Sequence, residues 1–521
     1  MNMKKYRNIA AFGMSALLLC SCGGDWLDTA PTSTTGSSTV FESTENAAMA
    51  INGLCKMMTR QYLGSQGFNG EGTIKMYYGN YPSENFSVNL PGWSNTINGR
   101  YLDNVTSTYD YYPWYYYYKL IGNANTLLAN IDNASGSQED RDFIKAQAYT
   151  FRAYSYLMLA QLYGNRWTDS NEGTTDALVL RTEPTNDDMP LSTLGQAYAL
   201  IYSDLDNAIR LYESSGKDRD ENDNYSPNLN VAYAVYARAA LTKQDYRLAR
   251  DYAILAREGY PLMSVSDYQA GFCTPNSEWI WSSYGALDET LYYYSYFAYI
   301  AYNSNASAVR SYPKCISKEL YDQIPATDIR KELFLDPQDD AYDSSTGRAD
   351  GDSDLDQRAR QAWPDLKSNA VVYAYMQFKI AAEDMPGVGH LNHFRSSEMY
   401  LIEAEADYFL NDGDGAREAL LALTRDSGRD PEYTCTATGT DLLNEIKKYR
   451  AIELWGEGFE WFDLKRWGNT IERKSFADGG NFITVLAVTI EPNDNNRWTW
   501  RVPRRETDYN HAITGNGVDS E

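Results

Sequence analysis

The chain has 521 residues and a formal net charge of −25, so it is long enough to bury a large core or to form several subdomains. This acidic balance argues against nucleic acid and anionic membrane surfaces as direct partners. Only three histidines are present, which disfavours a histidine-based metal site or catalytic triad. Tyrosine is abundant, with 44 residues. Because each buried phenol needs a hydrogen-bond partner, so many flat amphipathic rings favour a surface that recognises a ligand.

The N-terminus has the features of a bacterial lipoprotein signal. A basic start precedes a short apolar run over 9–20, which is too short for a permanent transmembrane helix. The run leads into Cys22 in a pattern that looks like a lipobox. We therefore expect residues 1–21 to be a signal peptide and Cys22 to carry the lipid that anchors the mature chain. Residues 22–40, rich in Ser and Thr, would form a flexible tether.

Apolar residues recur at helical spacing along much of the chain. The segments predicted as helices are 44–60, 114–131, 139–162, 193–212, 229–241, 248–258, 397–410, 416–424 and 442–455. Strand signals are short and few, at 279–283, 373–378, 484–489 and 498–501. The sequence therefore predicts a mainly α fold with few short strands.

Two of the predicted helix pairs resemble each other. Ala237 aligns with Ala404, and Asp245 in the following polar turn aligns with Asp412. Small alanines at a helix crossing let two helices approach closely, as in tetratricopeptide repeats. We interpret the pairs as copies of one repeat, although two unrelated Ala-rich hairpins would give a similar pattern.

Between two helical parts, 41–262 and 394–521, lies a segment of different composition. Residues 263–393 are rich in Tyr, Asp, Ser, Gly and Pro. This composition predicts an irregular insertion laid over a helical-repeat scaffold. Since recognition residues usually lie on loops held by a rigid scaffold, we expect the insertion to form the ligand face.

Several aromatic residues are candidates for stacking on the flat C–H faces of sugars. Trp93 lies in a Gly- and Asn-rich loop without a periodic partner, and in the insertion a row of tyrosines would share one face of a helix or a strand. The alternative is an aromatic layer packed against the helices. The candidate glycan-binding residues are Trp93, Arg100, Tyr101, Tyr292, Tyr296, Tyr299 and, more weakly, Trp363.

An acidic loop in the insertion is a weak candidate for a metal site. Asp350, Asp352 and Asp354 alternate along it and could offer oxygen ligands to Ca²⁺. The fixed Gly and distal Glu of an EF-hand loop are missing, so a solvated charged loop is favoured and no cofactor is expected.

The segment 450–467 mixes aromatic rings with charged groups, which enter a core only as paired charges. Glu453 and Glu457 lie one turn apart on a predicted helix, beside Arg450. That spacing favours ion pairing over the opposed carboxylates of a glycosidase. The chain also has no Gly-x-Ser-x-Gly motif and no phosphate-binding glycine loop. We therefore expect a structural segment and no enzymatic activity.

The same segment resembles the C-terminal signature of the SusD/RagB family, the outer-membrane glycan-binding lipoproteins of Bacteroidetes. The family pattern reads roughly Arg-x-x-Glu-Leu-x-x-Glu-Gly-x-Arg-x-x-Asp-Leu-x-Arg-Trp. The positions that fit it are Arg450, Glu453, Leu454, Glu457, Gly458, Asp463, Leu464, Arg466 and Trp467. Glu460 stands where an Arg is usual, and the closing family pattern Pro-x-x-Glu-x-x-x-Asn is present at 503–510.

The resemblance implies a scaffold of four tetratricopeptide-like helix pairs and a role in nutrient uptake. Such a protein is anchored in the outer membrane, here through Cys22, and captures an oligosaccharide at the cell surface. It then delivers the ligand to a SusC-like TonB-dependent transporter. The alternative is a helical-repeat lipoprotein of the same surface that captures peptides or binds another protein, and no sequence feature decides between glycan and peptide.

Overall fold

The computed structural model describes residues 40–64, 67–285, 294–492 and 498–514. The expected signal peptide, Cys22 and nearly all of the tether lie outside these ranges, as does Tyr292. Long helices dominate the described chain, and each segment predicted as helical overlaps one, so the predicted mainly α fold is confirmed. These helices are α3 (Thr44–Met57), α6 (Thr108–Asn130), α7 (Gln138–Tyr163), α8 (Leu194–Ser215), α9 (Leu229–Lys243), α10 (Tyr246–Ala256), α16 (Ser396–Phe409), α17 (Gly413–Leu421) and α18 (Gly439–Glu453).

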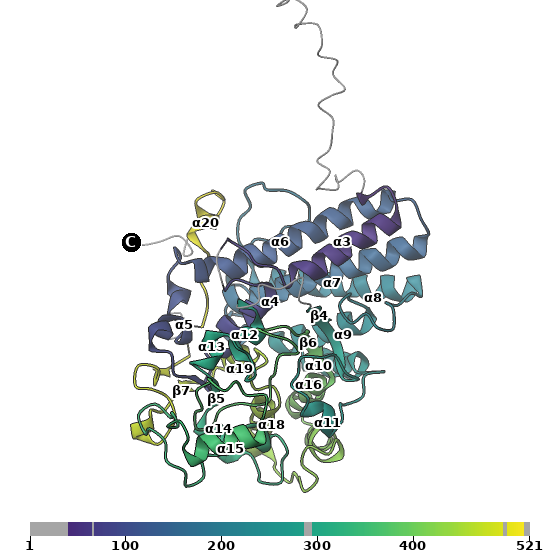
Figure 1. Ribbon diagram of the computed structural model, residues 1–521. Coiled ribbons are helices and arrows are strands. Elements are labelled where there is room, and N and C mark those ends of the chain that lie inside the picture. Colours follow the sequence, from purple (N-terminus) through teal and green to yellow (C-terminus); the bar gives the residue numbers. More distant parts are fainter. Residues whose placement is uncertain (1–39, 65–66, 286–293, 493–497, 515–521) are drawn as a thin grey trace, which may run out of the picture.

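The long helices pack in chain order (Figure 1). Helix α7 lies between α6 and α8 and also contacts α3, and these helices form the upper layer in Figure 1. The packing continues from α8 to α9 and α10, then to α16, which contacts α17 and α18. The short elements of the insertion lie beneath the upper layer.

Local sequence explains where the long helices begin and end. The Ser137 hydroxyl accepts a hydrogen bond from the Asp140 backbone N–H at 3.0 Å and starts α7. At the start of α8, Thr193 and Gln196 form a reciprocal capping box, which satisfies two otherwise unpaired backbone donors. Helix α8 ends at Gly216 with a φ of 60°, a conformation that glycine adopts without steric cost.

The predicted repeat is visible in the backbone. A residue in the left-handed region follows each of α9 and α16 within two positions, Gln244 with φ 67° and Asn411 with φ 63°. Asp245 and Asp412 follow and precede α10 and α17 with similar backbone angles. The alanines at the crossings are fully buried, namely Ala237, Ala239, Ala249, Ala404, Ala406 and Ala416. The two hairpins are neighbours, because α10 packs against α16, so they stack as repeats do.

The strands form small antiparallel pairs. The pairs are β1 (Phe86–Val88) with β5 (Lys314–Ile316), β2 (Asp176–Leu178) with β3 (Ser192–Thr193), β4 (Trp279–Ser283) with β6 (Leu391–Arg395), and β7 (Ile471–Glu472) with β8 (Thr489–Ile490). In the third pair Trp279 lies opposite Arg395. This pairing joins the start of the insertion to the strand that leads directly into α16.

The strand predictions were right at 279–283 and largely wrong elsewhere. Residues 373–378 make only isolated bridges, because Tyr375 has a φ of 63° and interrupts the extended chain. Of 484–489 only the last residue belongs to a strand, and 498–501 forms none. Strand β6 was not predicted, because its five residues are all buried and it lacks the alternation that marks a half-buried strand.

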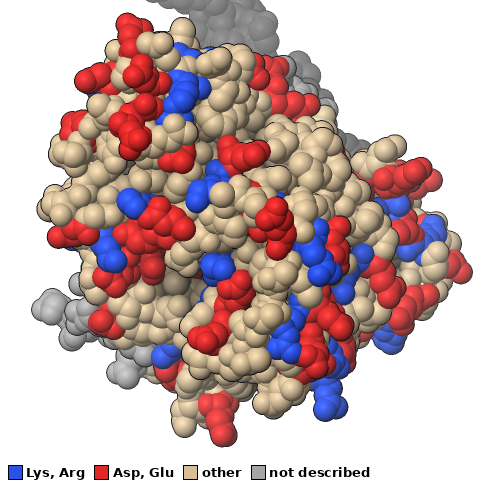
Figure 2. Space-filling view, turned by 90° about the horizontal axis from the view of Figure 1, so that it is seen from below, with Lys and Arg blue, Asp and Glu red and all other residues tan. Residues whose placement is uncertain are grey.

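The insertion 263–393 is built from short helices joined by loops. They are α11 (Val265–Tyr268), α12 (Tyr296–Ile300), α13 (Ser307–Arg310), α14 (Lys318–Gln323) and α15 (Asp354–Ala362). Figure 2 views the molecule from below, the side where α14 and α15 lie in Figure 1; acidic and basic side chains are interspersed there without a broad basic area. Within the described ranges, no helix is both long and apolar enough to cross a membrane.

Candidate functional site

Trp93 caps a cluster of aromatic rings contributed by three separate segments. It ends a short turn, η3 (Pro91–Trp93), and is half-buried. Its ring lies 5.7 Å from Tyr77 on η2 (Ile74–Asn80), 6.5 Å from Tyr81 and 6.2 Å from Tyr299 on α12, between ring centroids. These three tyrosines are buried. The half-exposed indole therefore rests on a support of packed rings.

A second pair of rings extends the cluster toward α6. Tyr101, on η4 (Arg100–Asp103), stacks on Tyr109 with centroids 4.7 Å apart and planes 8° from parallel. Tyr109 in turn lies 5.7 Å from Tyr77, so Tyr101 joins the ring cluster of Trp93. The Arg100 side chain is exposed beside it and adds a hydrogen-bond donor at the rim.

Burial disfavours ionisation of the phenols in this cluster. It raises the pKa of Tyr299 to about 12 and the pKa of Tyr77 well above its usual value. A Cβ on Gly67 would lie 2.7 Å from the Tyr77 hydroxyl and 3.1 Å from that of Tyr299, so the absence of a side chain lets the two hydroxyls meet. The Trp93 ring at the surface of this cluster can stack on an apolar face of a ligand.

The structure separates two other candidates from this cluster. Tyr296 is 6 % exposed and its hydroxyl donates to the Gly456 carbonyl at 2.6 Å, so its ring does not form an open row with Tyr299. Trp363 stacks on Phe378 at 3.6 Å, and among the described rings neither contacts the Trp93 cluster. Tyr77, Tyr81 and Tyr109 are not among the predicted site residues, since only tertiary packing brings their rings into the Trp93 cluster. Contact of any of these residues with sugar stays a prediction.

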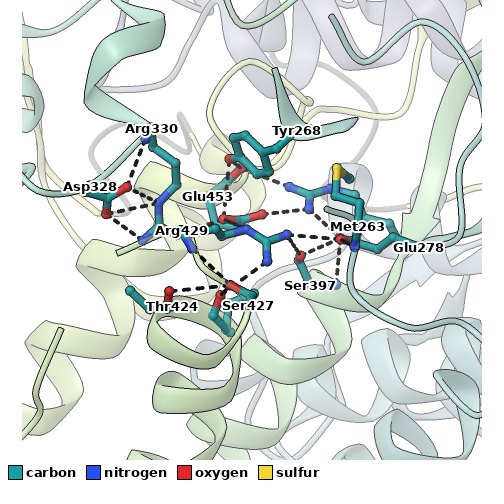
Figure 3. Close-up of polar contacts among 12 residues, drawn as sticks. Met263, Tyr268, Glu278, Asp328, Arg330, Ser397, Thr424, Ser427, Arg429 and Glu453 are labelled. Carbon is teal, nitrogen blue, oxygen red and sulfur yellow. Dashed lines mark hydrogen bonds and ion pairs between the residues drawn. The ribbon is translucent and has the colours of Figure 1, made fainter. Parts of the chain in front are cut away.

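Glu453 of the signature segment lies at the centre of a buried network of charges (Figure 3). Its carboxylate is 2.8 Å from Arg330, 2.7 Å from Arg395 and 3.3 Å from Arg429. The cations come from the insertion, from β6 and from the loop after α17. One carboxylate on α18 therefore joins three parts of the chain.

The other members of the network balance its charge. Glu278 pairs with Arg395 and Arg429, Asp328 with Arg330, and Glu457 with Lys379 and Arg395, at 2.7 to 3.0 Å. The cluster thus holds four carboxylates (278, 328, 453 and 457) and four cations (330, 379, 395 and 429). The guanidinium groups hold the pKa of Glu453 well below its usual value although burial alone would raise it.

A second set of pairs fixes the end of the signature. Arg450 bonds to Asp463 at 2.7 Å, and Arg466 bonds to Asp463 at 2.9 Å and to Glu405 of α16. The Trp467 indole N–H donates to Glu405 at 2.9 Å. These contacts hold α19 (Glu460–Trp467) against α16 and α18.

Glu460 makes hydrogen bonds in place of the ion pair that an Arg would offer. Its carboxylate accepts from the Asn85 backbone N–H at 3.2 Å and from the Asn85 side-chain amide. Burial raises its pKa to about 7. The departure from the family pattern is thus accommodated by a polar contact with the segment before β1.

The turn 456–458 of the signature segment also holds η2, the helix that carries Tyr77 of the Trp93 cluster. Lys75 donates to the Glu457 carbonyl at 2.9 Å. Asn80 donates to the Gly456 carbonyl at 2.7 Å and accepts from the Gly458 N–H at 2.8 Å. Hydrogen bonds therefore hold both ends of η2 against this turn. Because Glu457 of the turn belongs to the buried charge network, the network helps to fix the position of the Tyr77 ring.

The acidic loop of the insertion does not assemble a metal site. Asp354 is the first residue of α15, and the Ser353 hydroxyl accepts from the Asp356 backbone N–H at 3.3 Å. Asp350 and Asp352 precede this helix start. In the part of the chain that the structure describes, no group of three or more His, Cys, Asp or Glu residues is arranged to hold a metal ion.

Known structures share this fold. The chain is similar to a SusD-like carbohydrate-binding protein from Bacteroides vulgatus, with 24 % identity and a TM-score of 0.74 over 91 % of this chain and 98 % of that one. It is also similar to a putative sugar-binding protein from Bacteroides vulgatus, with 20 % identity, a TM-score of 0.71 and coverage of 91 % and 98 %. A SusD superfamily protein from Bacteroides thetaiotaomicron shares 22 % identity and has a TM-score of 0.70, with coverage of 91 % and 99 %. No curated protein matches the chain.

Two family matches cover most of both helical parts. Residues 25–241 match a SusD-like family described as "Starch-binding associating with outer membrane", and residues 373–516 match the SusD family. The second match contains the signature segment and the closing motif. The chain belongs to the SusD family.

Proposed function

We propose that this protein binds oligosaccharides at the surface of the outer membrane and delivers them to a SusC-like TonB-dependent transporter. The observation that carries the proposal is the half-exposed Trp93 ring on its support of buried tyrosines. An indole fixed in this way offers a flat apolar face at little entropic cost, because packing has already immobilised it. The description of the matched family as starch-binding and associated with the outer membrane supports the same role.

The proposed activity is binding without catalysis. The two signature carboxylates, Glu453 and Glu457, are held by Arg330, Arg395 and Lys379. A glycosidase needs one carboxyl that donates a proton and one that acts on the opposite face of the sugar. Carboxylates whose pKa is lowered by several cations are not general acids near neutral pH.

Affinity electrophoresis tests the ligand class. The chain lacking residues 1–22 is run through gels that contain neutral polysaccharides such as starch, xylan, mannan or β-glucan. We expect one polysaccharide to retard the protein and Trp93→Ala to weaken the retardation strongly. Trp167→Ala is the matched control, because Trp167 is also half-buried and packs edge-on against Tyr198 of α8. Equal retardation of all three proteins would reject Trp93 as the binding residue, and tight binding of peptides alone would favour the alternative class.

The anchor and the transporter are tested in cells. We expect Cys22→Ala to release the protein from the outer-membrane fraction, and intact mass spectrometry of the wild type to show acylation at Cys22. Chemical cross-linking followed by purification should recover a TonB-dependent barrel with the anchored protein. A Cys22→Ala chain that stays in the membrane fraction would contradict the proposed anchor.

A further inference from the structure

A groove of about 500 Å³ runs along α6, away from the residues of the Trp93 cluster. Its floor is the exposed side of α6, and its walls are the segment 181–188 and the chain around α20 (Arg504–Thr507). The volume is within the range of sites that enclose small organic ligands. None of the rings that surround Trp93 lines this groove.

The floor of the groove consists of two tyrosine rings followed by a part of the α6 backbone that no side chain covers. Tyr111 and Tyr115 are one helical turn apart, with ring centroids 5.5 Å apart, and both are half-buried. The Arg505 guanidinium lies 4.7 Å from the centre of the Tyr111 ring. Further along the same helix, a Cβ on Gly122 would meet no atom within 4 Å. A ligand can therefore approach the helix backbone closely beyond the two rings.

The walls of the groove are fixed by hydrogen bonds. The Glu506 carboxylate accepts from the Trp114 indole N–H at 3.1 Å and from the Asn510 amide at 2.9 Å. Asn510 also accepts from the Met189 N–H at 3.0 Å and donates to the Met189 carbonyl at 2.9 Å. Glu506 and Asn510 belong to the closing sequence motif, which thus fastens the C-terminal segment to the opposite wall. A groove built in this way is preorganised.

The lining chemistry identifies the class of ligand. Lys119, Arg181 and Arg505 face the groove together with Glu183, Asp188 and Glu506, so its charges balance and favour neither a polyanion nor a polycation. Flat rings interrupted by polar and charged side chains do not suit an apolar lipid chain. They suit sugar rings, which offer apolar C–H faces to tyrosine and hydroxyls to polar groups.

We propose that this groove is a second carbohydrate-binding site, which takes a short neutral oligosaccharide along α6 from Tyr111 to Gly122. Two sites on one chain would increase the retention of a long polysaccharide, since binding at one raises the effective concentration at the other. The proposal does not rest on the role given to Trp93, because the two sites share no lining residue.

Filling the groove tests the proposal. Gly122→Leu places a side chain where the structure has open space, and it replaces glycine with a better helix former. The matched control is Gly53→Leu in α3, an exposed helical glycine whose added Cβ would also meet no atom within 4 Å. Thermal unfolding of both variants establishes that each is folded.

Isothermal titration with maltohexaose, cellohexaose, xylohexaose and mannohexaose then counts the sites. For the oligosaccharide that binds, we expect two molecules per chain in the wild type and in Gly53→Leu, and one in Gly122→Leu. Trp93→Ala is expected to lose the other molecule. The proposal is overturned if Gly122→Leu binds as the wild type does, or if no oligosaccharide of the panel binds outside the Trp93 site. If Trp93→Ala keeps both molecules while Gly122→Leu loses one, the result supports the groove as a binding site and refutes the proposed role of Trp93.

Discussion

Neutralising Glu453 is expected to destabilise the protein more than any surface substitution. Its carboxylate is fully buried and contacts Arg330, Arg395 and Arg429 at 2.7 to 3.3 Å. Glu453→Gln keeps the size of the side chain but leaves four cations against three carboxylates. The surplus positive charge stays in the core, because each guanidinium is only 1 % exposed.

The expected loss of unfolding free energy in Glu453→Gln follows from the cost of leaving a buried charge without a partner. Removing one partner of a buried pair typically costs about 3–5 kcal/mol, which is a large share of the roughly 5–15 kcal/mol that keeps a domain folded. Arg429→Met alone leaves the opposite imbalance and is expected to cost a similar amount. The double variant restores the balance, so its cost should be smaller than the sum of the two by about 1–3 kcal/mol.

Urea unfolding of the four proteins at pH 7, followed by tryptophan fluorescence, measures these differences. The low pKa of Glu453 adds a pH test, since a depressed folded-state pKa gives stability that is present above the unfolded value, 4.5, and is lost as the pH falls below it. The wild type should therefore lose more stability than Glu453→Gln on acidification. A cost below about 1 kcal/mol for Glu453→Gln, or strict additivity in the double variant, would refute the reasoning.

Two further substitutions probe other buried groups. Asp110 is fully buried, and burial raises its pKa to about 9, so its folded form holds a proton that the unfolded form releases as the pH rises from about 4. Asp110→Asn should therefore stabilise the protein by a few kcal/mol at pH 8 and have little effect at pH 4, and equal effects in thermal scans at both pH values would contradict this. Tyr296→Phe removes the hydroxyl that donates to the Gly456 carbonyl and should cost about 1–3 kcal/mol in urea unfolding. It should leave oligosaccharide affinity unchanged, and a large loss of affinity in a stable variant would restore Tyr296 as a ligand contact.

The helical scaffold was predictable because local signals and tertiary packing agree. Helix α8, for instance, begins with a capping box at Thr193 and ends at a glycine, and both signals can be read from the chain. Strand β6 could not be found in this way, since it is buried on both faces and alternation is the signal for a strand. Tyr375 has a positive φ, which interrupts the extended backbone of 373–378, although the composition of that segment favoured a strand.

The candidate site was predictable only in part. A tryptophan in a Gly- and Asn-rich loop identified Trp93, but the support under it comes from η2 and α12, which are far apart in the chain. The ion pairs of the signature segment were also predictable only in part. The sequence indicated that Glu453 and Glu457 need cations, yet Arg330 and Lys379 lie in the insertion, where nothing in the spacing identifies them as the partners.

The balanced charge network has a consequence for how such a protein can change over evolutionary time. A single substitution that removes one of its eight charges leaves an unpaired charge in the core, so a change of charge there requires two replacements. Trp93 carries no charge and lies half-buried at the surface, so replacing it leaves the charge network balanced. The buried charges of the scaffold thus constrain one another, while the proposed ligand face can change one residue at a time, which would let one architecture acquire new ligands without being refolded.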